Sequence, residues 1–297
     1  MSKKDDEQRR QFFNQLNTTA YLSNFEEWAN GTIKNWTEID KFFDILDEII
    51  LVEYQEDFMV EIKKGVKFYR ARVIKFDDYK EFQKGIGYES DRLRGYNWEE
   101  SKEPPEDKTE AQRNSKKGEA ALYVADDEIT ACAEIKSKVR EYISVAEFEL
   151  SENVQVLDFS KMQFSKPFNQ YNDIYSVDLR KMLSILEFYF SKPVYSPEEY
   201  KCSQQIVRHF RENGITGFKY RSFYSSGNNY TFFDDAMKKF IWNDSRVLIN
   251  YATANLFISL DKGNMIDLDN INKIEKSISS DVREKMLDDT KQMWEAF

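Results

Sequence analysis

Apolar residues recur at helical spacing near the start of the chain. Between Thr37 and Tyr54 they fall three or four positions apart, at Ile39, Phe42, Phe43, Leu46, Ile49 and Ile50. This spacing places them on one face of a helix, for which Thr37 is a candidate N-cap. Gly31 interrupts the segment, which carries no cluster of catalytic residue types. We therefore expect residues 1–60 to form a helical N-terminal appendage.

The pattern changes to strict alternation after Gly65. Residues 66–73 (VKFYRARV) predict a strand with Phe68, Arg70 and Arg72 on one face and Tyr69 on the other. Further strands are expected at 121–125, 142–150, 154–159, 215–220, 230–233 and 247–252. Helices are expected at 127–140 (capped by Asp126 or Asp127), at 175–191, at 198–213 (between Ser196-Pro197 and Gly214) and near the C-terminus.

These elements mix helices and strands without a regular βαβ alternation. The order predicts an α+β fold, with a mixed, mostly antiparallel sheet and flanking helices. No GxGxxG or GxxxxGK[ST] motif is present, so neither a Rossmann dinucleotide site nor a P-loop is expected. The polar stretch 85–118 is long for a loop inside a domain, and such loops are commonly functional. We divide the chain into the appendage (1–60), a catalytic domain (61–240) and an extension packed on or beside it (241–297).

Composition narrows the class of protein. Apolar residues make up 41% of the chain, enough for a core, and the net charge of −10 argues against direct nucleic-acid binding through bulk positive charge. The cysteines Cys132 and Cys202 and the lone histidine His209 form no cluster, so no metal site is expected. We find no secretory signal and no apolar run of about 20 residues. A cytoplasmic protein without membrane association is expected.

The segment 112–136 is the first candidate for chemistry. Arg113 lies in a basic polar loop that can supply charge-assisted hydrogen bonds to a pyrophosphate. Tyr123 follows on a strand, and Glu134 lies in the next helix beside the small residues 131–133. Each has an ordinary alternative: a solvated arginine, a core tyrosine with its hydroxyl satisfied, and a surface glutamate.

The segment 215–233 is the second candidate. Ser222 follows a predicted strand, and Gly227-Asn228-Asn229 predicts a turn before the next strand. Such a loop presents hydroxyl, amide and backbone N–H donors to a ligand. The ordinary alternative is a β-turn whose glycine and asparagines serve only the backbone conformation.

Three segments together resemble the RES domain family. PPEDKTEAQRNSKKGEAALYVADDEITACAEIK is similar to the core motif of the family, which has a proline-containing lead, an R-x-N…G segment, an L-Y-x-A strand and a T-A-x-A-E helix. YKCSQQIVRHFRENGITGFKYRSFYSSGNNYTFF resembles its second region, and FYRAR resembles its first strand, with Arg70 in the arginine position. The three segments occur in the family's order across roughly 65–235, about three-fifths of the chain.

The resemblance implies a fold like that of ADP-ribosyltransferase toxins and cleavage of NAD+, which is then a substrate, with no separate cofactor. It implies that Glu134 stabilises positive charge on the ribose, that Arg113 holds the pyrophosphate with Arg70, and that Tyr123 stacks on the nicotinamide. Ser222 is the expected partner of the nicotinamide amide or a ribose hydroxyl. The substrate-binding residues implied are Arg70, Tyr69, Arg72, Ser222 and Asn228.

The implied function is an NAD+ glycohydrolase or phosphorylase that depletes NAD+ as a toxin or defence effector. Its implied partner is a helix-turn-helix antitoxin or another regulatory protein, and its apolar helical faces also allow a homo-oligomer. Two other functions use the same residues. One is an ADP-ribosyltransferase that modifies a protein or nucleic acid, and the other is a non-catalytic module that senses a nucleotide.

Overall fold

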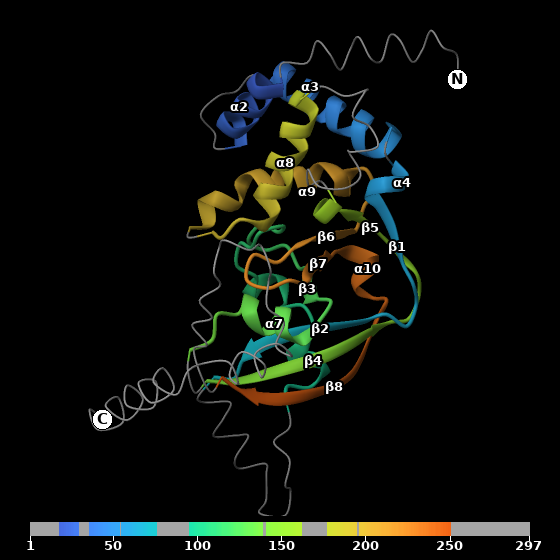
Figure 1. The fold of residues 1–297 in the computed structure, drawn as a ribbon. Helices are drawn as coiled ribbons and strands as arrows, with labels where there is room; N and C mark the ends of the chain where they lie inside the picture. Colours follow the sequence, from blue (N-terminus) through green and yellow to red (C-terminus); the bar gives the residue numbers. More distant parts are fainter. Residues whose placement is uncertain are drawn as a thin grey trace, which may run out of the picture. The chain divides into compact units, whose positions relative to one another are not determined.

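The computed structural model describes residues 18–29, 36–53, 55–75, 95–138, 141–161, 177–194 and 196–250 (Figure 1). The chain divides into two compact units after Thr253, and all described residues belong to the first. Its helices are α2 (Thr18–Ala29), α3 (Trp36–Asp47), α4 (Gln55–Phe58), α6 (Trp98–Ser101), α7 (Glu128–Glu134), α8 (Val177–Ser191), α9 (Lys201–Glu212) and α10 (Asp234–Met237). A π-helix follows α3 at Glu48–Glu53, and 3-10 turns cover Glu106–Lys108, Phe159–Lys161 and Pro197–Tyr200.

The strands form one sheet in the described part of the chain. They are β1 (Met59–Ile62), β2 (Lys67–Val73), β3 (Leu122–Ala125), β4 (Tyr142–Leu150), β5 (Val154–Asp158), β6 (Gly217–Arg221), β7 (Asn228–Phe232) and β8 (Phe240–Ile249). Their order is β1-β5-β6-β7-β3-β2-β4-β8, and only β5 and β6 pair in parallel. The predicted α+β fold with a mostly antiparallel sheet and flanking helices is confirmed.

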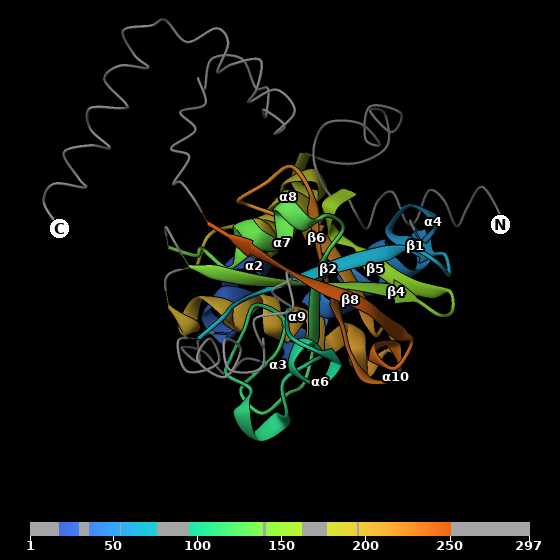
Figure 2. The same cartoon turned by 90° about the horizontal axis from the view of Figure 1, so that it is seen from below.

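The sheet is weakly joined between β2 and β3. β2 pairs with β4 along its whole length, from Lys67 to Val73, but its register with β3 contains the single pair Tyr69↔Ala125. β3 pairs instead with β7 over four positions. The sheet therefore consists of a β1-β5-β6-β7-β3 half and a β2-β4-β8 half, which are seen at different heights in Figure 1 and crossing in Figure 2.

The N-terminal helices share a hydrophobic core with the first half of the sheet. Phe25 of α2 stacks on Phe42 of α3 with ring centroids 4.4 Å apart. Both belong to the same buried cluster as Phe210 of α9 and Phe218 of β6. Figure 1 shows α2, α3, α8 and α9 together on the side of β5 and β6. The division into appendage, catalytic domain and extension stays a prediction; its boundary after residue 240 falls at the start of β8.

Several element boundaries differ from the prediction. The first 60 residues are not wholly helical, because 59–62 pair with 154–157 as β1. α3 begins at Trp36, so Thr37 is not its N-cap. β8 begins at Phe240 rather than 247 and pairs with β4 on both sides of an irregularity at Asn243. The partner strand decides the two strand cases, β1 and β8, since a short apolar run does not by itself distinguish strand from helix. The predicted C-terminal helix lies outside the described residues.

Capping residues in the local sequence correctly predicted several helix starts and ends. The Asp127 carboxylate accepts a hydrogen bond from Thr130 N at 2.8 Å and caps α7 as predicted. Ser196 and Glu199 form a capping box before α9, and Gly214 ends it with φ +85°. The predicted 127–140 helix is too long, because α7 stops at Glu134. Lys136 adopts φ +49°, which a continuing helix does not allow.

Within the described ranges, every helix is too short or too polar to span a bilayer.

Phe42→Ala tests whether α3 belongs to the common core. The Phe42 ring is fully buried, so its removal leaves a cavity and should lower the free energy of unfolding by about 3–5 kcal/mol. Denaturant unfolding measures this change, with Phe188→Ala as the control, because Phe188 is 55% exposed and its loss should cost less than about 1 kcal/mol. Equal, small effects of the two substitutions would contradict a shared core.

Candidate active site

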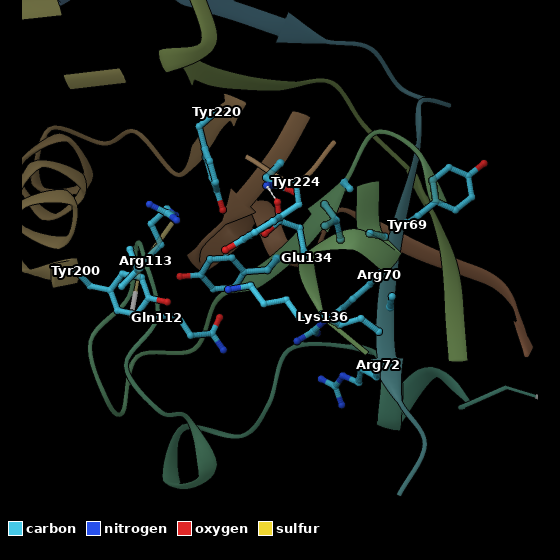
Figure 3. A pocket seen from close by; sticks show the side chains of 18 residues that line it. Tyr69, Arg70, Arg72, Gln112, Arg113, Glu134, Lys136, Tyr200, Tyr220 and Tyr224 are labelled. Carbon is cyan, nitrogen blue, oxygen red and sulfur yellow. Dashed lines mark hydrogen bonds between the residues drawn. The ribbon is translucent and has the colours of Figure 1, made fainter. Parts of the chain in front are cut away.

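A cavity of about 350 Å³ opens where β2 and β3 diverge. Its walls come from both halves of the sheet, from α7 and from the loop 222–227 between β6 and β7. Figure 3 shows arginine, lysine, tyrosine and glutamate side chains converging on it. The lining residues are Tyr69, Arg70, Ala71, Arg72, Gln112, Arg113, Tyr123, Val124, Ala125, Ala131, Glu134, Ile135, Lys136, Val194, Tyr200, Tyr220, Tyr224 and Asn229.

Glu134 is the only carboxylate among these lining residues. It is the last residue of α7. Its Oε1 accepts hydrogen bonds from Ser222 Oγ and from Asn229 Nδ2, each at 2.6 Å. Neither donor binds Oε2. The carboxylate is therefore held in one orientation by two neutral donors, with a second oxygen that these donors do not occupy.

Ser222 has its hydroxyl fully engaged. Its one proton is donated to Glu134, while the oxygen accepts hydrogen bonds from the backbone N–H groups of Tyr224 and Ser225, both at 3.1 Å. Ser222 does not line the cavity, whereas Asn229 does. The structure thus places Ser222 behind the carboxylate, as a group that orients Glu134.

Asn228 lies away from the cavity and fixes the base of the loop. Its backbone N–H and side-chain amide both donate to the Asp126 carboxylate, at 2.8 and 2.7 Å. Burial raises the pKa of Asp126, and these two hydrogen bonds oppose that shift. Asn228 and Asn229 belong to β7, so the predicted turn ends at Gly227.

Tyr123 and Tyr220 line the cavity as neutral phenols. The Tyr123 hydroxyl accepts a hydrogen bond from Asn114 N and shares another with Ser115 Oγ, both at 3.0 Å. Burial raises the pKa of Tyr123, and it raises the pKa of Tyr220 to about 12. Both rings therefore offer an uncharged aromatic surface near neutral pH.

Arg113 reaches the cavity from the 112–115 loop, but its guanidinium is already bound. Nη1 donates to Tyr189 O at 2.9 Å, and Nη2 donates to Lys192 O at 2.6 Å. These carbonyls lie at the C-terminal end of α8, where a positive charge is favoured. The guanidinium also lies 5.9 Å from the Tyr200 ring centroid.

The three candidate residues on β2 have different surroundings. Arg70 donates to Ser101 O at 3.0 Å and Arg72 donates to Lys102 O at 2.7 Å. Burial, and then the charge of Arg72, lower the pKa of Arg70, so an anion in the cavity would offset an unfavourable charge. Tyr69 differs from both: its hydroxyl donates to Glu147, and Figure 3 shows the ring directed away from the other labelled side chains.

The structure thus brings Arg70, Arg72, Arg113, Tyr123 and Glu134 to one cavity. It also adds residues to which the sequence assigned no individual role. They lie within or next to the matched motifs, which is the one sequence signal that could have found them. These residues are Gln112, Lys136, Tyr200, Tyr220, Tyr224 and Asn229.

The sequence model of the RES domain matches residues 88–247, more than half of the chain. The chain belongs to the RES domain family. The matched range runs from before α6 almost to the end of β8 and includes Glu134, Tyr123, Arg113 and Ser222. Arg70 on β2 precedes it.

Similarity beyond the RES domain is distant. A solved structure titled as the crystal structure of the M. tuberculosis MbcT–MbcA toxin–antitoxin complex aligns with 69% of this chain and 94% of its own. The sequences are 12% identical and the TM-score is 0.39. No curated protein matches the chain. Among the described residues of this RES protein, no three His, Cys, Asp or Glu side chains gather in a way that could hold a metal ion.

Gly227→Ala tests whether the loop 222–227 of the RES domain must pack closely against the start of α7. A Cβ at this position would collide with Thr130 Oγ1 and with the carboxylates of Asp126 and Asp127. We expect unfolding free energy to fall by about 1–3 kcal/mol in denaturant titrations. Gly118→Asn is the control, because space around Gly118 is open and Asn tolerates its φ of +84°. A Gly227→Ala protein as stable as the control would show that the loop relaxes freely.

Proposed function

We propose that this RES domain protein cleaves the bond between nicotinamide and ribose in NAD+, as a glycohydrolase. The observation that carries the proposal is the Glu134 carboxylate, oriented by Ser222 and Asn229 at 2.6 Å each and directed into a cavity with cationic and aromatic walls. The cavity volume of about 350 Å³ lies in the range of small-molecule sites.

The chemistry follows from how this bond breaks. The C1′–N1 bond breaks with its electron pair moving to N1, so nicotinamide leaves neutral and positive charge grows on the ribose ring. The Glu134 carboxylate stabilises that charge electrostatically and accepts a hydrogen bond from a ribose hydroxyl through Oε2. Water then adds at C1′ and releases one proton, giving ADP-ribose.

The other walls of the cavity fit the remainder of the substrate. Arg70 and Arg72 place two guanidinium groups on one wall, where the pyrophosphate would relieve their mutual repulsion. Tyr123 and Tyr220 present neutral rings on which the cationic nicotinamide ring stacks. Arg113 holds the loop against α8 and contributes its charge through space.

In the cell, we propose that loss of NAD+ makes the protein a toxin or defence effector. Its activity would then be restrained by an antitoxin of the helix-turn-helix type or by another regulatory protein. Membership of the RES domain family supports this role. Induced expression in a bacterial host should stop growth and lower NAD+, whereas the Glu134→Gln protein at equal abundance should do neither.

Glu134→Gln tests the chemical role directly. Replacing the carboxylate by an amide keeps the shape and removes the charge, so kcat for nicotinamide release from NAD+ should fall on the order of 10²–10³-fold. Glu128→Gln makes the same change in the same helix, where the carboxylate is paired with Arg246 outside the cavity. It should leave kcat within about twofold of wild type.

Product analysis separates the related reactions. ADP-ribose and nicotinamide formed from NAD+ and water alone support hydrolysis. ADP-ribose 1″-phosphate formed in phosphate buffer identifies a phosphorylase, and release only after addition of protein or nucleic acid identifies a transferase. Wild type as inert as Glu134→Gln, with NAD+ bound but not cleaved, would refute the enzyme and favour a sensing module.

A further inference from the structure

Lys136 lies at the mouth of the cavity in an unusual backbone conformation. It follows Ile135, the C-cap of α7, and has φ +49°, which is uncommon for residues other than glycine, asparagine or aspartate. Its side chain lines the cavity, and Figure 3 shows it beside Glu134 and Tyr224. The end of the catalytic helix thus turns a lysine toward the site instead of continuing into solvent.

Tyr224 is the neighbour of the Lys136 ammonium. Lys136 Nζ lies 4.5 Å from the centroid of the Tyr224 ring, in a cation–π contact. The neighbouring Tyr224 is the largest cause of the raised pKa of Lys136, and the ammonium is protonated at neutral pH. Tyr224 N is bound to Ser222 Oγ, which binds Glu134. The contact therefore joins the two segments that carry the carboxylate and its donor.

The remaining cations of the cavity are more fully engaged than Lys136. Both terminal nitrogens of Arg113 donate to main-chain carbonyls, and Arg70 and Arg72 donate to carbonyls of residues 100–102. An ammonium carries three N–H donors, and an aromatic face satisfies them less well than an anionic oxygen does. Lys136 is the cation of this lining that is best able to bind a phosphate directly.

We propose that Lys136 binds the pyrophosphate of the dinucleotide at the cavity mouth and that Tyr224 positions its ammonium there. This inference rests on the proposed function and adds a binding residue to it. The contact forms equally in the ground state and the transition state, because the pyrophosphate does not react. Its loss should therefore raise KM and leave kcat unchanged.

Steady-state cleavage of NAD+ by Lys136→Met tests the contact. We expect KM to rise about tenfold with kcat within twofold of wild type, as for the loss of one charge-assisted hydrogen bond. Lys136→Arg should recover most of the affinity. Lys136→Gly removes the side chain while suiting the positive φ, so it should reproduce the rise in KM without backbone strain. Lys138→Met removes the same charge two residues away, outside the lining, and should match wild type.

Calorimetric titration with ADP-ribose keeps the test independent of turnover. Wild type should bind it about tenfold more tightly than Lys136→Met, and added salt should narrow the difference. A KM and an ADP-ribose Kd within twofold of wild type in Lys136→Met would overturn the inference, as would a fall in kcat at constant KM. If wild type binds ADP-ribose in a Lys136-dependent way but does not cleave NAD+, the proposed function fails and this site stands. Absence of ADP-ribose binding to a wild type that still cleaves NAD+ would overturn the inference and leave the proposed function standing.

Discussion

Two hydrogen bonds to one oxygen of Glu134 tie together the segments that make the cavity. Ser222 and Asn229 lie 88 and 95 positions further along the chain, yet both donate to Oε1 at 2.6 Å. Ser222 lies in a loop that packs tightly at Gly227 against the cap of α7. Asn229 lies on β7, which pairs with β3, the strand that leads into α7. The orientation of the carboxylate is thus a property of the packing between helix, loop and strand.

The helices also hold the loop 112–115 in place. Gln204 of α9 donates to Gln112 O and Ser115 O at 2.7 and 3.0 Å, and Ser203 donates to Arg113 O at 2.5 Å. On α8, Tyr189 accepts from Arg113 through its carbonyl and donates to Glu26 of α2 through its hydroxyl. α2, which precedes the matched RES region, therefore supports a loop inside that region through α8. α2 and α3 also share a hydrophobic core with α9 and β6.

Much of the fold could be predicted because its signals are local. Alternation predicted β2, apolar spacing predicted α3, and Asp127 and Gly214 marked a helix start and end. The errors occurred where a partner decides the outcome. β1 exists because β5 pairs with it, and β8 extends back to Phe240 because β4 runs alongside. The stop of α7 at Glu134 coincides with contacts to a distant loop that no window of sequence contains.

The sequence by itself determined the fold class, the RES domain motifs and the residue types of the site, because these depend on periodicity and on motif order. It could not determine which donors each side chain has left for a ligand. Arg113 is bound to carbonyls of α8, Ser222 gives its proton to Glu134, and Asn228 holds Asp126, while Lys136 and Asn229 face the cavity. Hydrogen bonds between segments 76 to 102 residues apart settle this division, and they exist only once the two halves of the sheet and the helices have packed.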